Sequence, residues 1–75
     1  MGSYAAKVSL VYHGPPDEPA KLRIDRALNG VPGIKHYLVT DSRRIVRVFY
    51  DPEIIQRERI RFLLLGVGFS SVNFT

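Results

Sequence analysis

Four segments of the chain have the alternating or short apolar pattern of β-strands. The alternation is clearest in Ala6–Tyr12, where Val8, Leu10 and Tyr12 fall on one side and polar residues on the other. The other three segments are Ile34–Thr40, Ile45–Tyr50 and Phe69–Phe74. Each has the length of an ordinary strand, so the pattern predicts four strands.

A helical repeat of apolar residues lies between the first two predicted strands. It consists of Ala20, Ile24, Ala27, Leu28 and Val31. These positions line one face of a helix. The charged residues between them are expected on the solvent face: Lys21, Arg23, Asp25 and Arg26. Pro19 suits a first helical turn, Asp17 and Glu18 are expected to cap it, and Asn29–Gly30 is expected to end the helix.

A second helix is predicted after the third strand. Asp51–Pro52 is expected to open it and Gly68 to end it. Its buried stripe is predicted to be Ile60, Leu63, Leu64 and Val67.

The order of these elements is strand, helix, strand, strand, helix, strand. The short polar connection Asp41–Arg44 predicts that the second and third strands form an antiparallel hairpin. This order predicts an α+β, ferredoxin-like βαββαβ fold with a four-stranded antiparallel sheet and two helices on one face. We expect a single domain over residues 1–75, with 6–74 ordered and 1–5 a tail or cloning scar.

Composition removes several classes of function. The chain has no cysteine, which excludes disulfides, iron–sulfur clusters and thiolate metal sites. No apolar run reaches the roughly 18–20 residues of a membrane span, and no serine has the histidine and carboxylate partners of a catalytic triad. We therefore expect a non-catalytic domain that is not membrane-spanning. We also expect it to be cytoplasmic, either free or as the cytosolic part of a membrane protein, to be monomeric and to need no cofactor.

Five short sequence features occur along the chain in the order found in a known family of domains. They are Gly14, Ile24 with Ala27–Leu28, Pro32–Gly33–Ile34, Tyr50–Asp51–Pro52, and Gly68–Phe69. From about Val8 to Val72 the chain resembles the heavy-metal-associated domain family, found as metallochaperones and as cytosolic modules of heavy-metal P-type ATPases. The family pattern has a loop glycine, I-x-x-A-L, P-G-V, Y-D-P and G-Y at these places.

The departure from the family pattern falls on its metal-binding motif. Asp17 and Ala20 stand at the two cysteine positions, and Pro15 stands at the methionine position. Paired thiolates suit Cu(I), whereas alanine offers no ligand and a single aspartate is a hard one. The resemblance therefore does not imply copper shuttling for this chain.

What the resemblance does imply is a docking surface. In the family, the loop before the first helix and the two helices present that surface to partner domains. The corresponding residues here are Pro15, Pro16, Asp17, Lys21, Arg57 and Arg61. The implied partner is a protein, such as the cytosolic part of a metal transporter or a related domain of the same family.

A rebuilt metal site is a second hypothesis. His13, Asp17 and Glu18 share one loop, and an imidazole with two carboxylates suits Zn(II), Ni(II) or Co(II). The alternative interpretation is that Asp17 and Glu18 cap the helix while His13 ends a strand at the surface. His36, remote in sequence, is interpreted as a solvated strand residue.

A nucleic-acid or acidic-surface binder is a third hypothesis. The net charge is +4, and arginines recur in the hairpin and the second helix. Recognition of RNA by this fold uses aromatic residues on the open sheet face, where Phe49 and Tyr37 are candidates. The segment Arg44–Tyr50 lacks the glycine-rich pattern of that class, which disfavours nucleic acid as the partner.

Overall fold

The computed structural model describes residues 5–14 and 19–75 and confirms the predicted fold. The elements in this part of the chain are β1 (Ala6–His13), α1 (Ala20–Leu28), β2 (Ile34–Thr40), β3 (Ile45–Tyr50), α2 (Arg57–Leu65) and β4 (Ser71–Phe74). The bounds of β2 and β3 are the predicted ones. None of the described helices is long and apolar enough to cross a membrane.

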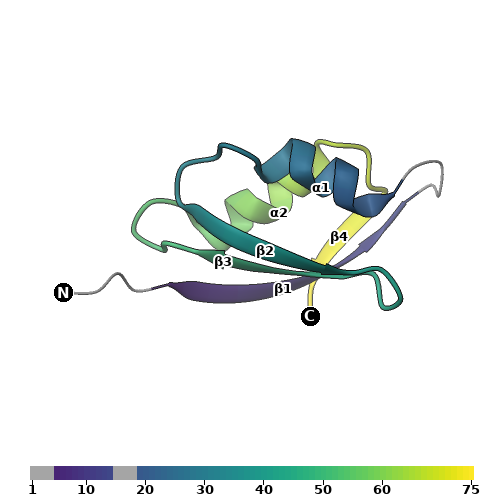
Figure 1. Ribbon diagram of the computed structural model, residues 1–75, viewed down its shortest axis with the longest axis horizontal. Helices are drawn as coiled ribbons and strands as arrows, with labels where there is room; N and C mark the ends of the chain where they lie inside the picture. Colours follow the sequence, from purple (N-terminus) through teal and green to yellow (C-terminus); the bar gives the residue numbers. More distant parts are fainter. Residues whose placement is uncertain (1–4, 15–18) are drawn as a thin grey trace.

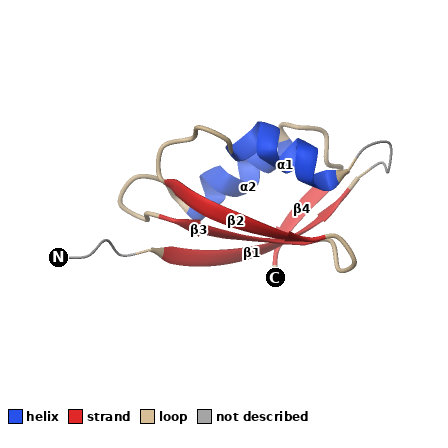
Figure 2. Ribbon diagram, in the orientation of Figure 1, coloured by secondary structure: helices blue, strands red, loops and turns tan. Residues whose placement is uncertain are grey.

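The strands form one sheet in the order β2-β3-β1-β4, and every neighbouring pair is antiparallel. The central pair is in register, with Val8 opposite Val48 and Leu10 opposite Val46. Both helices lie on the same face of this sheet (Figure 2). The βαββαβ order therefore produces two layers, one of helices and one of strands (Figure 1).

The hydrophobic core lies between the two layers. It is built from alternate residues of the central strands and from one stripe of each helix, as the sequence pattern predicts. Its fully buried members are Leu10, Ile24, Leu28, Val46, Val48, Ile60, Leu64 and Val72. Opposite strand residues such as Lys7, Arg47 and Phe49 therefore point away from the helices.

Helix α2 begins later than predicted. Asp51–Pro52 does not open it, because the carbonyl of Asp51 accepts the amides of Ile54 and Ile55 at 3.0 Å and closes a separate turn. Gln56 is then extended, at φ −97° and ψ 154°, and the helix starts at Arg57. The turn buries Ile55 in the core, an apolar contact that the helical stripe did not include.

Two further bounds near the C-terminus differ from the prediction: helix α2 ends earlier than predicted, and strand β4 begins later. Helix α2 ends at Leu65, so Val67 lies beyond it and is half-buried rather than part of a helical stripe. Strand β4 starts at Ser71 instead of Phe69. Phe69 instead packs its ring 5.0 Å from the ring of Tyr12. Residues 66–70 are therefore a connection between α2 and β4, and the Phe69 side chain packs this connection against Tyr12.

Candidate functional site

The predicted metal and docking loop is only partly described. Pro15, Pro16, Asp17 and Glu18 lie outside the described residues, so their predicted roles stay predictions. His13 is the exposed last residue of β1, as expected for a strand end at the surface. Among residues 5–14 and 19–75, no three histidine or carboxylate side chains come together as metal ligands.

The end of β1 is held firmly against the start of β4. The amide of Ser70 donates to the carbonyl of His13 at 2.8 Å, and the Ser70 hydroxyl donates to the same oxygen at 3.1 Å. A Cβ atom at Gly14 would lie 3.1 Å from the ring of Phe69. This is tighter than an ordinary van der Waals contact, so the absence of a side chain at Gly14 helps the chain to pass the ring closely.

Arg23 does not lie on the solvent face where the sequence pattern placed it. It is half-buried, and its Nη1 donates to the carbonyl of Val67 at 2.8 Å. A side chain on the neighbouring Gly68 would collide with the Arg23 guanidinium, and Gly68 has φ +106°. Arg23 thus ties helix α1 to the connection between α2 and β4, a contact that helical spacing cannot reveal.

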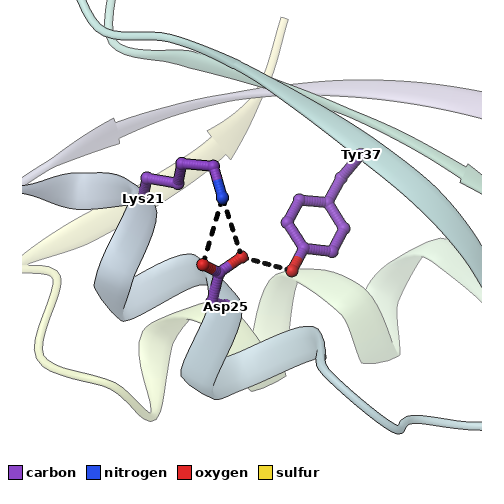
Figure 3. A network of polar contacts seen from close by, with 3 residues as sticks. All are labelled: Lys21, Asp25 and Tyr37. Carbon is purple, nitrogen blue, oxygen red and sulfur yellow. Dashed lines mark hydrogen bonds and ion pairs between the residues drawn. The ribbon is translucent and has the colours of Figure 1, made fainter.

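Lys21 belongs to a polar network that joins α1 to β2 (Figure 3). Its Nζ lies 3.2 Å from Oδ2 of Asp25, and the hydroxyl of Tyr37 donates to Oδ1 of Asp25. The hydrogen bond from Tyr37, with that from Lys21 second, lowers the pKa of Asp25. The same bond, with burial second, raises the pKa of Tyr37 to about 12. Lys21 is exposed, but its charge is shared with Asp25.

The two arginines predicted for docking, Arg57 and Arg61, both turn toward β4. The guanidinium of Arg57 lies 5.3 Å from the ring centroid of Phe74. Nε of Arg61 donates to the carbonyl of Val72 at 2.6 Å, and its Nη1 lies 4.0 Å from a Glu58 oxygen. They share a face, as one helical turn between them requires. Both side chains therefore connect α2 to β4.

A different part of the helical layer exposes large apolar side chains. Phe62 is 65% exposed on α2, and Leu22 is 51% exposed on α1. The guanidinium of Arg59 lies 5.9 Å from the Phe62 ring centroid. We call Leu22, Arg59 and Phe62 the outer helical face. The sequence signal was available, because Leu22 and Phe62 are apolar residues that fall outside the buried stripes.

The α1–β2 and β3–α2 connections lie at the same end of the molecule (Figure 1). A shallow groove opens between them. The amide of Asp51 joins these connections by donating to the carbonyl of Gly33 at 2.8 Å. The groove has a volume of about 440 Å³ and is lined by Val31, Pro32, Ile54, Ile55, Gln56 and Arg59. Its walls are mostly apolar, and sequence reasoning did not find it.

The open face of the sheet carries one of the two aromatic residues predicted there. Phe49 lies on that face, and the ring of His36 stacks on it at 4.3 Å with an interplanar angle of 18°. Tyr37 was the other candidate, and that expectation is wrong, since its hydroxyl reaches Asp25 on the helical side. His36 is exposed as expected, but it is one half of a ring pair.

Comparison with known proteins supports the fold. No family model matches the chain, and no curated protein sequence does either. Three solved structures share its arrangement. They are oxidised MerP from Ralstonia metallidurans CH34, with a TM-score of 0.83, a copper-binding domain of the P-type ATPase HMA7, with a TM-score of 0.80, and the N-terminal domain of a potential copper-translocating P-type ATPase from Bacillus subtilis, with a TM-score of 0.82.

These matches cover almost the whole of both partners. MerP is 17% identical over 96% of this chain and 99% of its own. The HMA7 domain is 20% identical, with 92% of each chain covered. The Bacillus subtilis domain is 18% identical over 95% of this chain and 88% of its own. The chain therefore has the fold of heavy-metal-associated domains, and at these identities the likeness extends to the fold alone.

Proposed function

We propose that this chain is a protein-docking module that binds its partner through the outer helical face. The observation that carries the proposal is the exposure of Phe62, at 65%, with the guanidinium of Arg59 5.9 Å from its ring centroid. Aromatic and arginine side chains dominate the binding energy of protein interfaces. Leu22, on the neighbouring helix, adds a second apolar contact on the same side of the sheet.

Charge indicates the kind of partner. The net charge is +4, and Lys21, Arg57 and Arg59 are all exposed residues of the helical layer. A partner with acidic groups around an apolar centre would complement this surface. The solved neighbours with the same fold include copper-binding domains of P-type ATPases, which supports a related domain or another cytosolic part of a metal transporter as the partner.

The predicted docking residues take unequal parts in this proposal. Lys21 and Arg57 lie at the rim, where their charges contribute mainly to the rate and orientation of binding. Arg61 is held by the Val72 carbonyl and contributes less. Pro15, Pro16 and Asp17 lie outside the described residues, so their part in docking stays a prediction. The module works as a cytoplasmic monomer and catalyses no reaction.

An NMR titration tests the proposal. The labelled chain is titrated with the Cu(I)-loaded N-terminal domain of the Bacillus subtilis ATPase as the probe. Saturable amide shifts are expected at Leu22, Arg59 and Phe62, and Phe62→Ala should weaken binding at least about tenfold, as loss of a central aromatic contact does. The matched control is Leu38→Ala, an exposed apolar residue on β2 at 54% exposure, which should leave affinity unchanged.

Two results would overturn this function. One is the absence of saturable shifts with the probe domain at concentrations where weak docking is detectable. The other is an equal loss of affinity in the Leu38→Ala and Phe62→Ala variants, because the two residues lie on different layers of the molecule.

A further inference from the structure

The charges of this chain are separated between the strands and the rest of the molecule. The four strands contain no aspartate or glutamate, but they contain Lys7, Lys35 and Arg47. The acidic residues in the described ranges all lie elsewhere: Asp25, Asp41, Asp51, Glu53 and Glu58. The sheet is therefore the part of the structure with positive charge and no acidic side chain to offset it.

A stacked pair of rings lies beside two of these cations, Lys7 and Arg47, on the open face. Phe49 is opposite Lys7 on β1 and opposite His36 on β2, so the three side chains form a row across the sheet. The imidazole lies nearly parallel to the phenyl ring, and His36 remains exposed. His36 is thus an exposed flat ring that stacks on the ring of Phe49.

The next row of the same face continues the pattern. Arg47 is opposite Ser9 on β1 and Leu38 on β2. Arg47 is exposed, and Leu38 is 54% exposed. Neighbouring rows on one face of a strand are about 7 Å apart. Cations at Lys7 and Arg47 therefore flank the ring pair and an apolar side chain within a small area.

We propose that this open face binds single-stranded nucleic acid. A base would stack on the exposed side of His36, and neighbouring phosphates would pair with Lys7 and Arg47. Base stacking on a ring platform beside cations is how proteins hold single strands without reading their sequence. An acidic polypeptide would satisfy the cations, but it has no regular series of flat rings to match the platform.

The proposed contacts use base faces and phosphates and do not use the sugar. RNA and DNA single strands should therefore bind alike, with little sequence preference. The site is separate from the outer helical face, since the helices lie on the other side of the sheet (Figure 2). The two proposals therefore stand or fall independently.

The test is fluorescence anisotropy of the full chain with labelled single-stranded dodecamers of mixed sequence, one of DNA and one of RNA. Binding is expected at about 50 mM salt and should weaken as salt rises. The slope of log K against log salt should be about −1.4, because each of the two phosphates that pair with Lys7 and Arg47 contributes about 0.7 on a single strand.

Variants locate the site. Arg47→Glu should weaken binding about tenfold or more, whereas Arg59→Glu, an identical charge change on an exposed residue of α2, should leave it within about twofold. His36→Ala removes the platform's exposed ring and should also weaken binding about tenfold, the effect of losing one stacked base. Phe49→Leu keeps apolar packing and should give a similar loss.

Three outcomes would overturn the proposal. Equal losses in Arg47→Glu and Arg59→Glu would mean that binding follows net charge alone. Displacement of the oligonucleotide by polyglutamate at matched charge concentration would identify the face as a general binder of acidic chains. Absence of binding at low salt, with His36→Ala and wild type giving the same flat signal, would remove nucleic acid as the ligand.

Discussion

At the scale of single residues, the arginines show how poorly a count of charges describes a surface. Arg23 and Arg61 each donate a hydrogen bond to a backbone carbonyl, at 2.8 and 2.6 Å, and so join a helix to a distant part of the chain. Arg59 instead lies over an exposed ring. The formal charge of +4 is therefore distributed between structural contacts and surfaces that can meet a partner.

The two tyrosine–carboxylate bonds predict how stability depends on pH. Burial and a hydrogen bond to Asp41 raise the pKa of Tyr12 to about 12, and the Asp25 bond does the same for Tyr37. An unfolded tyrosine ionises near 10.0. Between pH 10 and pH 12 the folded chain therefore keeps the phenol protons of Tyr12 and Tyr37, whereas the unfolded chain loses them. The stability that these two groups contribute should be fully present below pH 10 and fall as pH rises toward 12.

Alkaline denaturation curves and tyrosinate absorbance would measure this dependence. Tyr37→Phe should flatten the loss of stability above about pH 10 and remove one late-titrating phenol from the absorbance curve. Tyr12→Phe should have the same two effects, because it removes the hydrogen bond from Tyr12 to Asp41. A wild-type curve whose phenols all titrate near their ordinary pKa of about 10 would contradict the prediction.

At the scale of elements, helix α2 has two faces with opposite consequences. Leu64 is fully buried in the core, whereas Phe62, on the outer helical face, is 65% exposed. Leu64→Ala should lower the free energy of unfolding by about 2–5 kcal/mol, since it removes apolar contacts and leaves a cavity. Phe62→Ala should change it by no more than about 0.5 kcal/mol.

Urea denaturation of the two variants beside the wild type measures both effects. A loss above about 2 kcal/mol in Phe62→Ala, the range of buried apolar residues, would show that the outer helical face is part of the folding core. In that case its loss of docking affinity could not be assigned to a missing contact with a partner.

Prediction from sequence succeeded where one pattern determined an element. Strands β2 and β3 lie on either side of the short polar connection Asp41–Arg44, so the end of one and the start of the other followed from spacing. It failed at the start of α2, because Asp51–Pro52 suits a helix start and a turn equally well. The turn prevails because Asp51 closes it and Ile55 enters the core.

The candidate sites were less predictable than the elements because they depend on contacts between distant residues. Arg23 finds the Val67 carbonyl 44 residues away, and no helical spacing encodes that contact. The His36–Phe49 pair arises from a register shifted by a β-bulge between Ile34 and His36. The exposure of Phe62 was not predicted either, although a large apolar residue outside the buried stripe is a sequence signal for an exposed side chain.

At the scale of the whole molecule, the two layers offer surfaces of different chemistry. The helical layer presents apolar residues with an arginine over one exposed ring, and the sheet presents a ring pair beside two cations. Both surfaces belong to one thin domain, with the core between them. Substitutions on one layer can therefore test one proposal while leaving the other surface intact.

The same fold in copper-binding domains raises the question of what metals do to this chain. Cu(I) prefers thiolate and thioether ligands, and the chain has no cysteine and a single methionine. A bicinchoninate competition assay should therefore show no transfer of Cu(I) to this protein. Retention of copper against bicinchoninate would contradict the argument from ligand softness.

Harder divalent ions test the other metal hypothesis, because His13, Asp17 and Glu18 would suit Zn(II), Ni(II) or Co(II). If these residues form a site, NMR titration should show saturable shifts at the amides of His13 and Ala20, and His13→Ala should abolish them. That result would establish the rebuilt metal site and make docking at the loop depend on metal.

Two outcomes would contradict the metal hypothesis. If the amide signals of His13 and Ala20 do not shift on addition of these ions, the site does not exist. Shifts that persist in His13→Ala would exclude that ligand set, because two carboxylates alone do not form a site selective for these ions.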